Sequence, residues 1–163
     1  MTNWLSPAEM RAWRAYIGTN DDLSGALAAD LARHGMDLGD YQVLVYLSEA
    51  ERNQMRMCDL AERLQLSPSG LTRRLDGLVK SGAVVRQGSE LDRRVMMAVL
   101  TDSGRAALER AAPFHVESVR RRIFDHLDEA QIAALESIFT AINEALDADP
   151  ACAGHVKALA VTP

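Results

Sequence analysis

Apolar positions at helical spacing dominate both ends of the chain. Near the N-terminus, Trp13 and Ile17 lie four residues apart, and leucines continue the same face. Pro7 suits the first position of this helix, and Gly35 suits its end. These features predict a long first helix, with a bend or a weak point near Gly18.

The C-terminal part predicts two more helices. Thr101 is a suitable N-cap for a long helix that runs to about His126 and should be kinked at Pro113, because proline removes a helical hydrogen bond. Asp128 and Gln131 form a capping-box pattern at the start of a last helix. The apolar stripe of that helix consists of Leu135, Ile138, Phe139, Ile142 and Leu146.

The middle of the chain predicts shorter helices. Asp37 is a suitable N-cap for a second helix, and further helices are expected over residues 59–64 and 68–81. Ser67 is a suitable N-cap for the helix at 68–81, and Pro68 suits its first position. Gly82 suits the end of the last of these, because glycine readily adopts a left-handed conformation.

The period then changes from that of a helix to that of strands. Residues 83–87 and 95–100 are short and rich in β-branched or long apolar side chains, with polar residues between them, which indicates a β-hairpin. A two-stranded hairpin is marginal by itself. We therefore expect it to lean on the two short helices, as the wing of a helix-turn-helix.

Together these elements predict a mainly α fold with a small β-hairpin, in a single domain over residues 1–163. The expected parts are a winged helix-turn-helix DNA-binding region at 37–101, dimerisation helices at 5–35 and 102–147, and a flexible tail at 148–163. The terminal helices carry apolar stripes, and a chain this short has few other elements that could cover them. A two-fold homodimer, in which the partner covers them, is therefore expected.

Composition narrows the functional classes. With 48% hydrophobic and 25% charged residues, the chain should bury a core. No apolar stretch reaches the roughly 20 residues that cross a bilayer, and the N-terminus lacks a signal-peptide pattern, so we expect a cytoplasmic protein without membrane contact. There is no Gly-rich phosphate loop, HExxH or GxSxG motif, so the sequence predicts neither an enzyme nor a cofactor.

Charge is unevenly distributed along the chain. The formal net charge is −5, yet residues 63–105 hold eight lysines and arginines against four acids, a local charge of +4. The remainder therefore carries −9. A basic middle between acidic ends is typical of a nucleic-acid-binding element on another scaffold, although a solvated charged face is the alternative.

The helix expected at 68–81 is the candidate recognition helix. Leu71, Leu75 and Leu78 share one face, which should pack inward. The candidate DNA-binding residues are Ser67, Ser69, Gly70, Thr72, Arg73 and Arg74. A major groove about 12 Å wide admits one helix, and arginine can make bidentate contacts with guanine or phosphate. An ordinary amphipathic helix with solvated arginines is the alternative.

The tip of the expected hairpin adds a second basic element. Asp92, Arg93 and Arg94 place two guanidinium groups at the end of the ribbon. A narrow minor groove attracts inserted arginine, and Asp92 is positioned to pair with Arg94. A solvated turn is the alternative.

These motifs resemble those of MarR-type transcription regulators of bacteria. The resemblance rests on residues 58–64 and 69–73, and on a wing signature in which Asp92, Arg94 and Leu100-Thr101 stand at the family spacing, followed by Gly104-Arg105. It implies a homodimer whose first and last helices interlock, with one winged helix-turn-helix per subunit. It also implies repression of nearby genes, relieved by a small, often aromatic, anionic ligand.

Other candidate sites remain open. Trp13, Arg14, Tyr16 and Tyr41 are candidates to line a pocket for an aromatic or phenolic ligand, with core packing as the alternative. Cys58, expected to be partly buried, would serve a redox-responsive regulator of the same fold, and reduced thiols are the simpler expectation. No histidine pair has metal-binding spacing, so no metal site is predicted. A winged-helix module that binds an acidic protein partner is the rival function.

Overall fold

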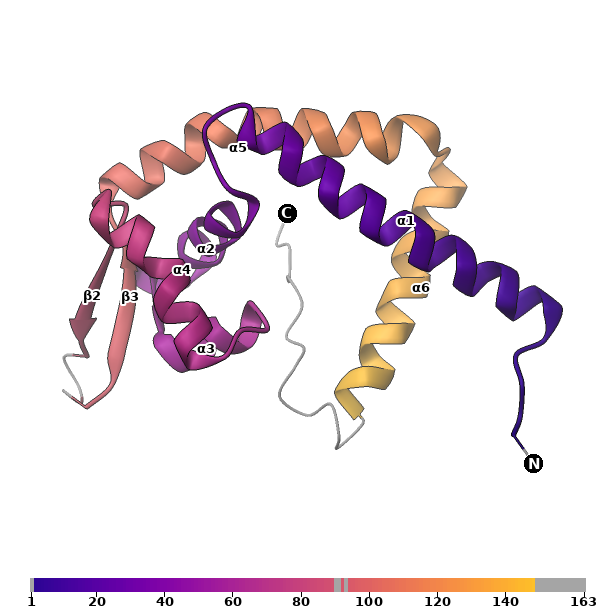
Figure 1. The fold of residues 1–163 in the computed structure, drawn as a ribbon, viewed down its shortest axis with the longest axis horizontal. Coiled ribbons are helices and arrows are strands. Elements are labelled where there is room, and N and C mark those ends of the chain that lie inside the picture. Colours follow the sequence, from indigo (N-terminus) through magenta and orange to yellow (C-terminus); the bar gives the residue numbers. More distant parts are fainter. Residues whose placement is uncertain (1, 90–91, 93, 149–163) are drawn as a thin grey trace.

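The computed structural model describes residues 2–89, 92 and 94–148. In chain order the elements are α1 (Pro7–Ala32), α2 (Leu38–Glu49), the 3₁₀ turn η1 (Glu51–Asn53), β1 (Gln54–Arg56), α3 (Met57–Arg63), α4 (Pro68–Lys80), β2 (Val84–Gly88), β3 (Met96–Leu100), α5 (Asp102–Arg122), the 3₁₀ turn η2 (Phe124–His126) and α6 (Glu129–Ala148). Figure 1 shows a lobe formed by α2, α3, α4 and the strands, from which α1 and α5 extend, with α6 following from the far end of α5. The predicted fold class, mainly α with a small β element, is confirmed.

The predicted helix starts are confirmed by their caps. The Glu9 amide donates to Ser6 Oγ at 3.3 Å, and the Ser6 amide donates to the Glu9 carboxylate at 2.7 Å, so α1 opens with a complete capping box. Asp128 and Gln131 make the same reciprocal pair at the start of α6. α1 runs without a break through Gly18, where the sequence predicts a bend or weak point.

The predicted hairpin is part of a three-stranded antiparallel sheet in the order β1-β3-β2. β2 pairs with β3 so that Val85 faces Val99, and β1 adds to the other edge of β3 with Met55 opposite Ala98. The predicted hairpin of β2 and β3 is therefore confirmed, and β1 is a third strand that the sequence did not predict. β1 has only three residues, which is too short for an alternating pattern to stand out in the sequence.

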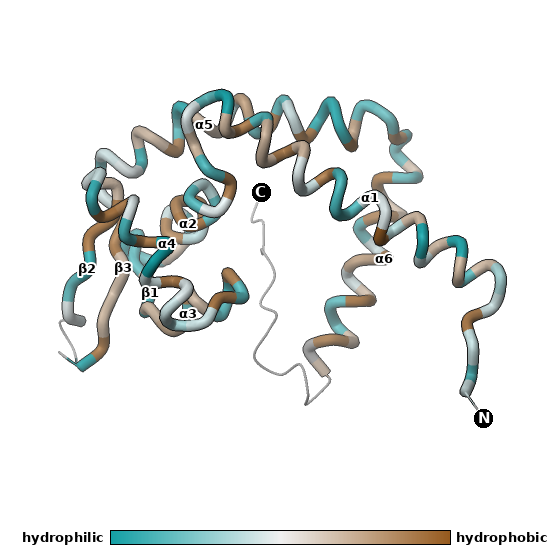
Figure 2. The backbone as a smooth tube through the Cα atoms, in the orientation of Figure 1, coloured by the Kyte–Doolittle hydropathy of each residue, from teal (hydrophilic) through white to brown (hydrophobic). Residues whose placement is uncertain are grey.

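The hydrophobic core lies inside the lobe. Its fully buried leucines and valines are Val43, Leu44, Leu47, Leu60, Leu71, Leu75 and Val84. Figure 2 shows further apolar positions along α6 and the outer part of α1, away from this core. In the described residues, no helix is both long and apolar enough to cross a membrane.

The base of the wing is locked to the start of α5. The Thr101 hydroxyl donates to the carbonyls of Gly82, at 2.7 Å, and Ala83, at 3.0 Å, and accepts from the Gly104 amide at 3.0 Å. A Cβ at Gly104 would collide with the Ala83 carbonyl oxygen. This close approach gives a physical reason for threonine and glycine at these two positions of the sequence signature.

Asp30 joins α1 to α5. Its side chain is buried, and its carboxylate accepts from Ser118 Oγ at 2.6 Å, from Arg122 Nε at 2.6 Å and from Arg121 Nη2 at 2.9 Å. Arg33 also pairs with it. The hydrogen bonds from Arg122 and Ser118 hold the pKa of the Asp30 carboxyl far below its usual range. These contacts tie the C-terminal end of α1 to the C-terminal end of α5.

Candidate nucleic-acid interface

The N-terminal end of α4 is built from the capping residues predicted from the sequence. Ser67 Oγ accepts from the Gly70 amide at 3.1 Å, and Pro68 occupies the first position of the helix. Gly70 is half-buried, and a Cβ there would lie 3.1 Å from Ser67 Oγ. Glycine at this position thus leaves room for the cap to close.

The outer face of α4 exposes a short polar series. Ser69, Thr72 and Arg73 are all exposed there. The Thr72 hydroxyl donates to the Pro68 carbonyl at 2.9 Å, so its oxygen keeps accepting capacity toward the outside. Arg73 makes no ion pair within residues 2–89, 92 and 94–148, which leaves its guanidinium available to a partner.

Arg74 has different surroundings. Its guanidinium pairs with Asp37 and lies 3.4 Å from the Asp40 carboxylate, both at the start of α2. Burial raises the pKa of Asp40, and Arg74 opposes that shift. The side chain predicted to contact DNA is thus already engaged within the lobe.

Arg86 on β2 is a further residue of this surface that the sequence did not single out. Its Nη2 donates to the Thr72 carbonyl at 2.7 Å and to the Asp76 carboxylate at 2.9 Å, both on α4. A strand arginine that points at a helix leaves no signal in the hydrophobic pattern. Only the packing of β2 against α4 brings these groups together.

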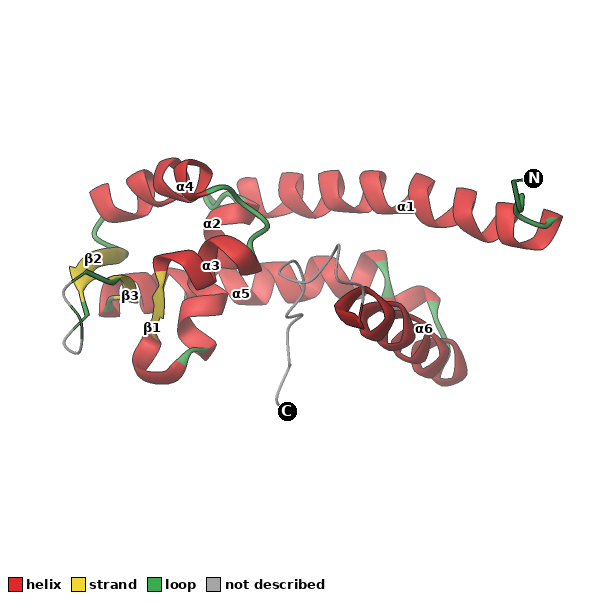
Figure 3. Cartoon of the chain, turned by 90° about the horizontal axis from the view of Figure 1, so that it is seen from below, coloured by secondary structure: helices red, strands yellow, loops and turns green. Residues whose placement is uncertain are grey.

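The wing tip is shaped by Asp92. Its Oδ1 accepts from the Arg94 amide at 2.9 Å, and its carbonyl accepts from the Val95 amide at 2.9 Å. Asp92 therefore acts on the Arg94 backbone, where the sequence predicted a pair with the guanidinium. Arg94 is exposed, and Arg93 lies outside the described residues. Figures 1 and 3 place α4 and the wing strands at the end of the molecule opposite α6.

The four residues predicted to form a ligand pocket do not line one cavity. Tyr41 is buried, and its ring lies 4.6 Å from that of His115. Trp13 and Tyr16 lie on α1 with their rings 5.9 Å apart and about half exposed. The aromatic residues predicted for the pocket thus belong to two separate places.

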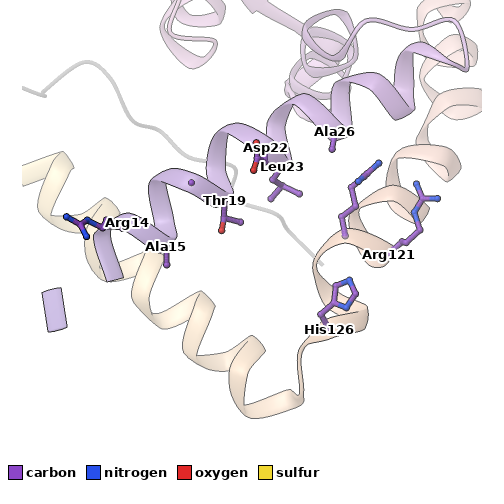
Figure 4. A pocket seen from close by; sticks show the side chains of 10 residues that line it. Arg14, Ala15, Thr19, Asp22, Leu23, Ala26, Arg121 and His126 are labelled. Atoms are coloured by element: carbon purple, nitrogen blue, oxygen red, sulfur yellow. The ribbon is translucent and has the colours of Figure 1, made fainter. Parts of the chain in front are cut away.

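An open, solvent-facing cavity of about 650 Å³ lies between α1 and the end of α5 (Figure 4). Its basic side chains are Arg14, Arg121, Arg122 and His126, and Asp22 is its acid. Of the residues predicted for the ligand, Arg14 lines it. Figure 4 shows Arg14 and His126 at opposite ends of the cavity.

Cys58 is exposed, so its predicted partial burial is wrong. Its Sγ lies 3.2 Å from the Asp59 carboxylate, and that hydrogen bond raises the pKa of the thiol. Because the thiolate is the form that reacts with oxidants, this environment disfavours a redox sensor at Cys58.

Comparison with known proteins matches the chain to regulators of transcription. The model of the MarR family matches residues 34–95. AbsC, a MarR family transcriptional regulator from Streptomyces coelicolor, is 37% identical with a TM-score of 0.84, over 91% of this chain and 100% of AbsC. Sco3205 from the same organism, solved in complex with DNA, is 34% identical with a TM-score of 0.85, over 95% of this chain and 97% of its own. The HTH-type transcriptional repressor YetL of Bacillus subtilis is 30% identical over 98 residues, which span 60% of this chain and 59% of YetL.

Proposed function

Because the chain belongs to the MarR family of DNA-binding transcription regulators, we propose that it is a homodimeric repressor that binds a pseudo-palindromic duplex site and is released by a small molecule. The relatives it matches are regulators of transcription and not enzymes. The observation that carries the proposal is the shared position of the exposed α4 face and the wing, with Arg73 and Arg94 both accessible.

In this proposal the N-terminal end of α4 enters the major groove. Arg73 offers a bidentate donor to a guanine edge, and Ser69 and Thr72 offer hydroxyl groups. Arg94 at the wing suits the adjacent minor groove, whose negative potential attracts a guanidinium. Sco3205, similar over nearly the whole chain, supports duplex DNA as the partner because it was solved with DNA.

The proposed homodimer rests on apolar surface that a single chain leaves uncovered. On α6, Ile138 is 55% exposed and Ile142 is 48% exposed, and on α1 Trp13 is 52% exposed. Large exposed apolar patches are unusual on a monomer and mark interaction surfaces. A two-fold dimer through these helices would set the two α4 helices about 34 Å apart, one turn of the duplex.

The proposed effector is a small organic anion in the cavity between α1 and α5. The volume of about 650 Å³ suits a small molecule, and the basic lining favours a carboxylate or phenolate. Arg121 and Arg122 already hold Asp30, so an anion that draws on them would change the link between α1 and α5. Release requires that the anion bind this altered arrangement more tightly than the DNA-bound one.

Binding-site selection from random duplexes tests the DNA proposal. The expected result is an enriched sequence with approximate two-fold symmetry, bound with an affinity that falls log-linearly with salt because counterions are displaced. Aromatic carboxylates are then added to that complex to test whether they release the DNA. The Arg14→Ala substitution is expected to weaken this release. If no duplex is enriched, a protein-binding winged helix becomes the better reading of the lobe.

A further inference from the structure

Arginines hold α4 on two sides. On one side Arg74 extends from α4 to the start of α2, where it meets the carboxylates of Asp37 and Asp40. On the other side Arg86 extends from β2 to α4, where it meets the Thr72 carbonyl and the Asp76 carboxylate. Both arginines lie in the basic segment whose charge first indicated nucleic-acid binding.

Gly39 makes room for the Arg74 contact. A Cβ built on Gly39 would lie 2.6 Å from Arg74 Cζ and 2.8 Å from its Nη2. The guanidinium therefore rests against the first turn of α2, at a position where any side chain would displace it. Because the arginine end is flexible, such a side chain would move Arg74 rather than the helix backbone.

Arg86 is more deeply placed than a solvated arginine. Its side chain is 27% exposed, and its Nε is buried without a hydrogen-bond partner among the described residues. The guanidinium has exchanged part of its hydration for a backbone carbonyl and one carboxylate, so its Nη2 is already engaged within the lobe.

From this geometry we propose that Arg74 and Arg86 are positioning residues that clamp the recognition helix between α2 and β2, and that Arg73 is the arginine of α4 that meets DNA. The inference rests on the proposed function. Direct readout depends on the rotation and depth of α4 in the groove, because a bidentate contact tolerates little displacement. The clamp sets both, from the side of α2 and from the side of the wing.

The Asp76→Asn substitution tests the role of Arg86 in the clamp, because the two explanations predict opposite changes in DNA affinity. Removing an acid from a DNA-facing helix should strengthen binding to any duplex if the acid acts only through its charge. The clamp predicts instead a loss of about fivefold for the selected duplex, comparable to losing one partly exposed charge pair. Affinity for a random duplex of equal length should stay the same or rise.

Glu62→Gln is the matched control. Glu62 lies exposed on α3, in the same helix-turn-helix, and makes no ion pair in the described part of the chain. The Glu62→Gln substitution removes one negative charge, as Asp76→Asn does, and leaves α4 unchanged. If Asp76→Asn and Glu62→Gln change both affinities alike and upward, Arg86 does not position α4.

Gly39→Ala tests the Arg74 half without changing any charge. The added methyl group should displace the guanidinium, and the clamp predicts a loss of about fivefold for the selected duplex with the random duplex unaffected. The loss cannot come from unfolding of α2, since alanine favours a helix more than glycine does. A gain for both duplexes, with a salt slope steeper by about 0.9, would instead make Arg74 a phosphate contact.

The clamp also has a signature without DNA. In the DNA-free protein, the Arg86 guanidinium should show slowly exchanging protons by NMR that are lost in Asp76→Asn and kept in Glu62→Gln. If the wild-type chain enriches no duplex, the proposed function fails while this measurement still decides the clamp. Rapid exchange of these protons in the wild type would overturn the clamp whatever the DNA result.

Discussion

Arg73 and Arg74 are neighbours in the chain, yet their guanidinium groups meet different surroundings. Arg73 is exposed on the outer face of α4, whereas Arg74 turns toward Asp37 and Asp40. One step along a helix rotates a side chain by about 100°, which is enough to take it from the solvent side to the flank that packs on α2. The two adjacent arginines therefore differ in environment: Arg74 is engaged within the lobe and Arg73 is exposed.

Arg73→Ala should weaken binding to the selected duplex by about 1–3 kcal/mol, because a bidentate contact with a base edge is lost. Affinity for a random duplex should change much less. Measurement of both affinities at one salt concentration checks this. An equal loss on the two duplexes would assign Arg73 to a phosphate.

Asp30 predicts a pH dependence of stability. Its pKa is lowered in the folded chain from an ordinary value of 3.8, so the unfolded chain binds the proton more readily. The stabilisation is complete above that ordinary value and is lost progressively as the pH falls below about 4.

Asp30→Asn should therefore lower the Tm at pH 7 and reduce the further drop in Tm between pH 7 and pH 3. Thermal unfolding at the two pH values measures both effects. Asp21→Asn, at an exposed position of the same helix, is the control and should leave the drop as in the wild type. An unchanged drop in Asp30→Asn would show that other carboxyl groups control acid unfolding.

At the scale of elements, the wing works as a unit with α4 and α5. β2 is tied to α4 by Arg86, and its start is tied to α5 by Thr101 and Gly104. β1 closes the other edge of the sheet. A change at either joint should thus alter how the wing and α4 face a partner.

Two glycine substitutions separate a tight joint from an open position. Gly104→Ala should destabilise the fold by about 1–3 kcal/mol, because the new methyl group overlaps the Ala83 carbonyl. Gly77→Ala, in the exposed part of α4 with nothing within 4 Å of its Cβ position, should stabilise it by about 0.5–1 kcal/mol. Urea unfolding of the DNA-free protein compares them. Equal effects would mean that the joint relaxes freely around the methyl group.

At the scale of the whole molecule, the packed lobe and the long projecting helices differ in what they bury and expose. The lobe holds the larger cluster of buried residues, whereas α6 keeps its apolar side chains exposed in the single chain. The charge divides in the same way, with the basic segment in the lobe and the acidic remainder mostly outside it. This arrangement suits a dimer whose two lobes each present the basic segment to one duplex.

The double substitution Ile138→Glu with Ile142→Glu should convert the proposed dimer to a monomer, because two charges would have to be buried on one face of α6. Sedimentation or size-exclusion measurement at micromolar concentration checks the mass. Thr140→Glu, on the opposite face of the helix, is the control and should stay dimeric. A wild-type chain that is monomeric under these conditions would contradict the dimer.

Sequence alone determined the local features of this protein. Capping residues placed the starts of α1, α2, α4 and α6, and the change of period placed β2 and β3, because these signals act within a few residues. The family motifs could also be identified from the sequence, since their residues are close in the chain. These features were sufficient for the fold class and for most of the exposed face of α4.

Tertiary structure alone decided which groups meet across the chain. Only packing brought β1 to β3, Arg74 to α2, Arg86 to α4 and Asp30 to the end of α5. It also placed Tyr41 apart from Trp13 and Tyr16, although the sequence had suggested these aromatic residues as the lining of one pocket. Contacts over tens of residues depend on the angles between helices, which no local pattern encodes. Only the folded lobe therefore decided which of the two adjacent arginines, Arg73 or Arg74, stays exposed.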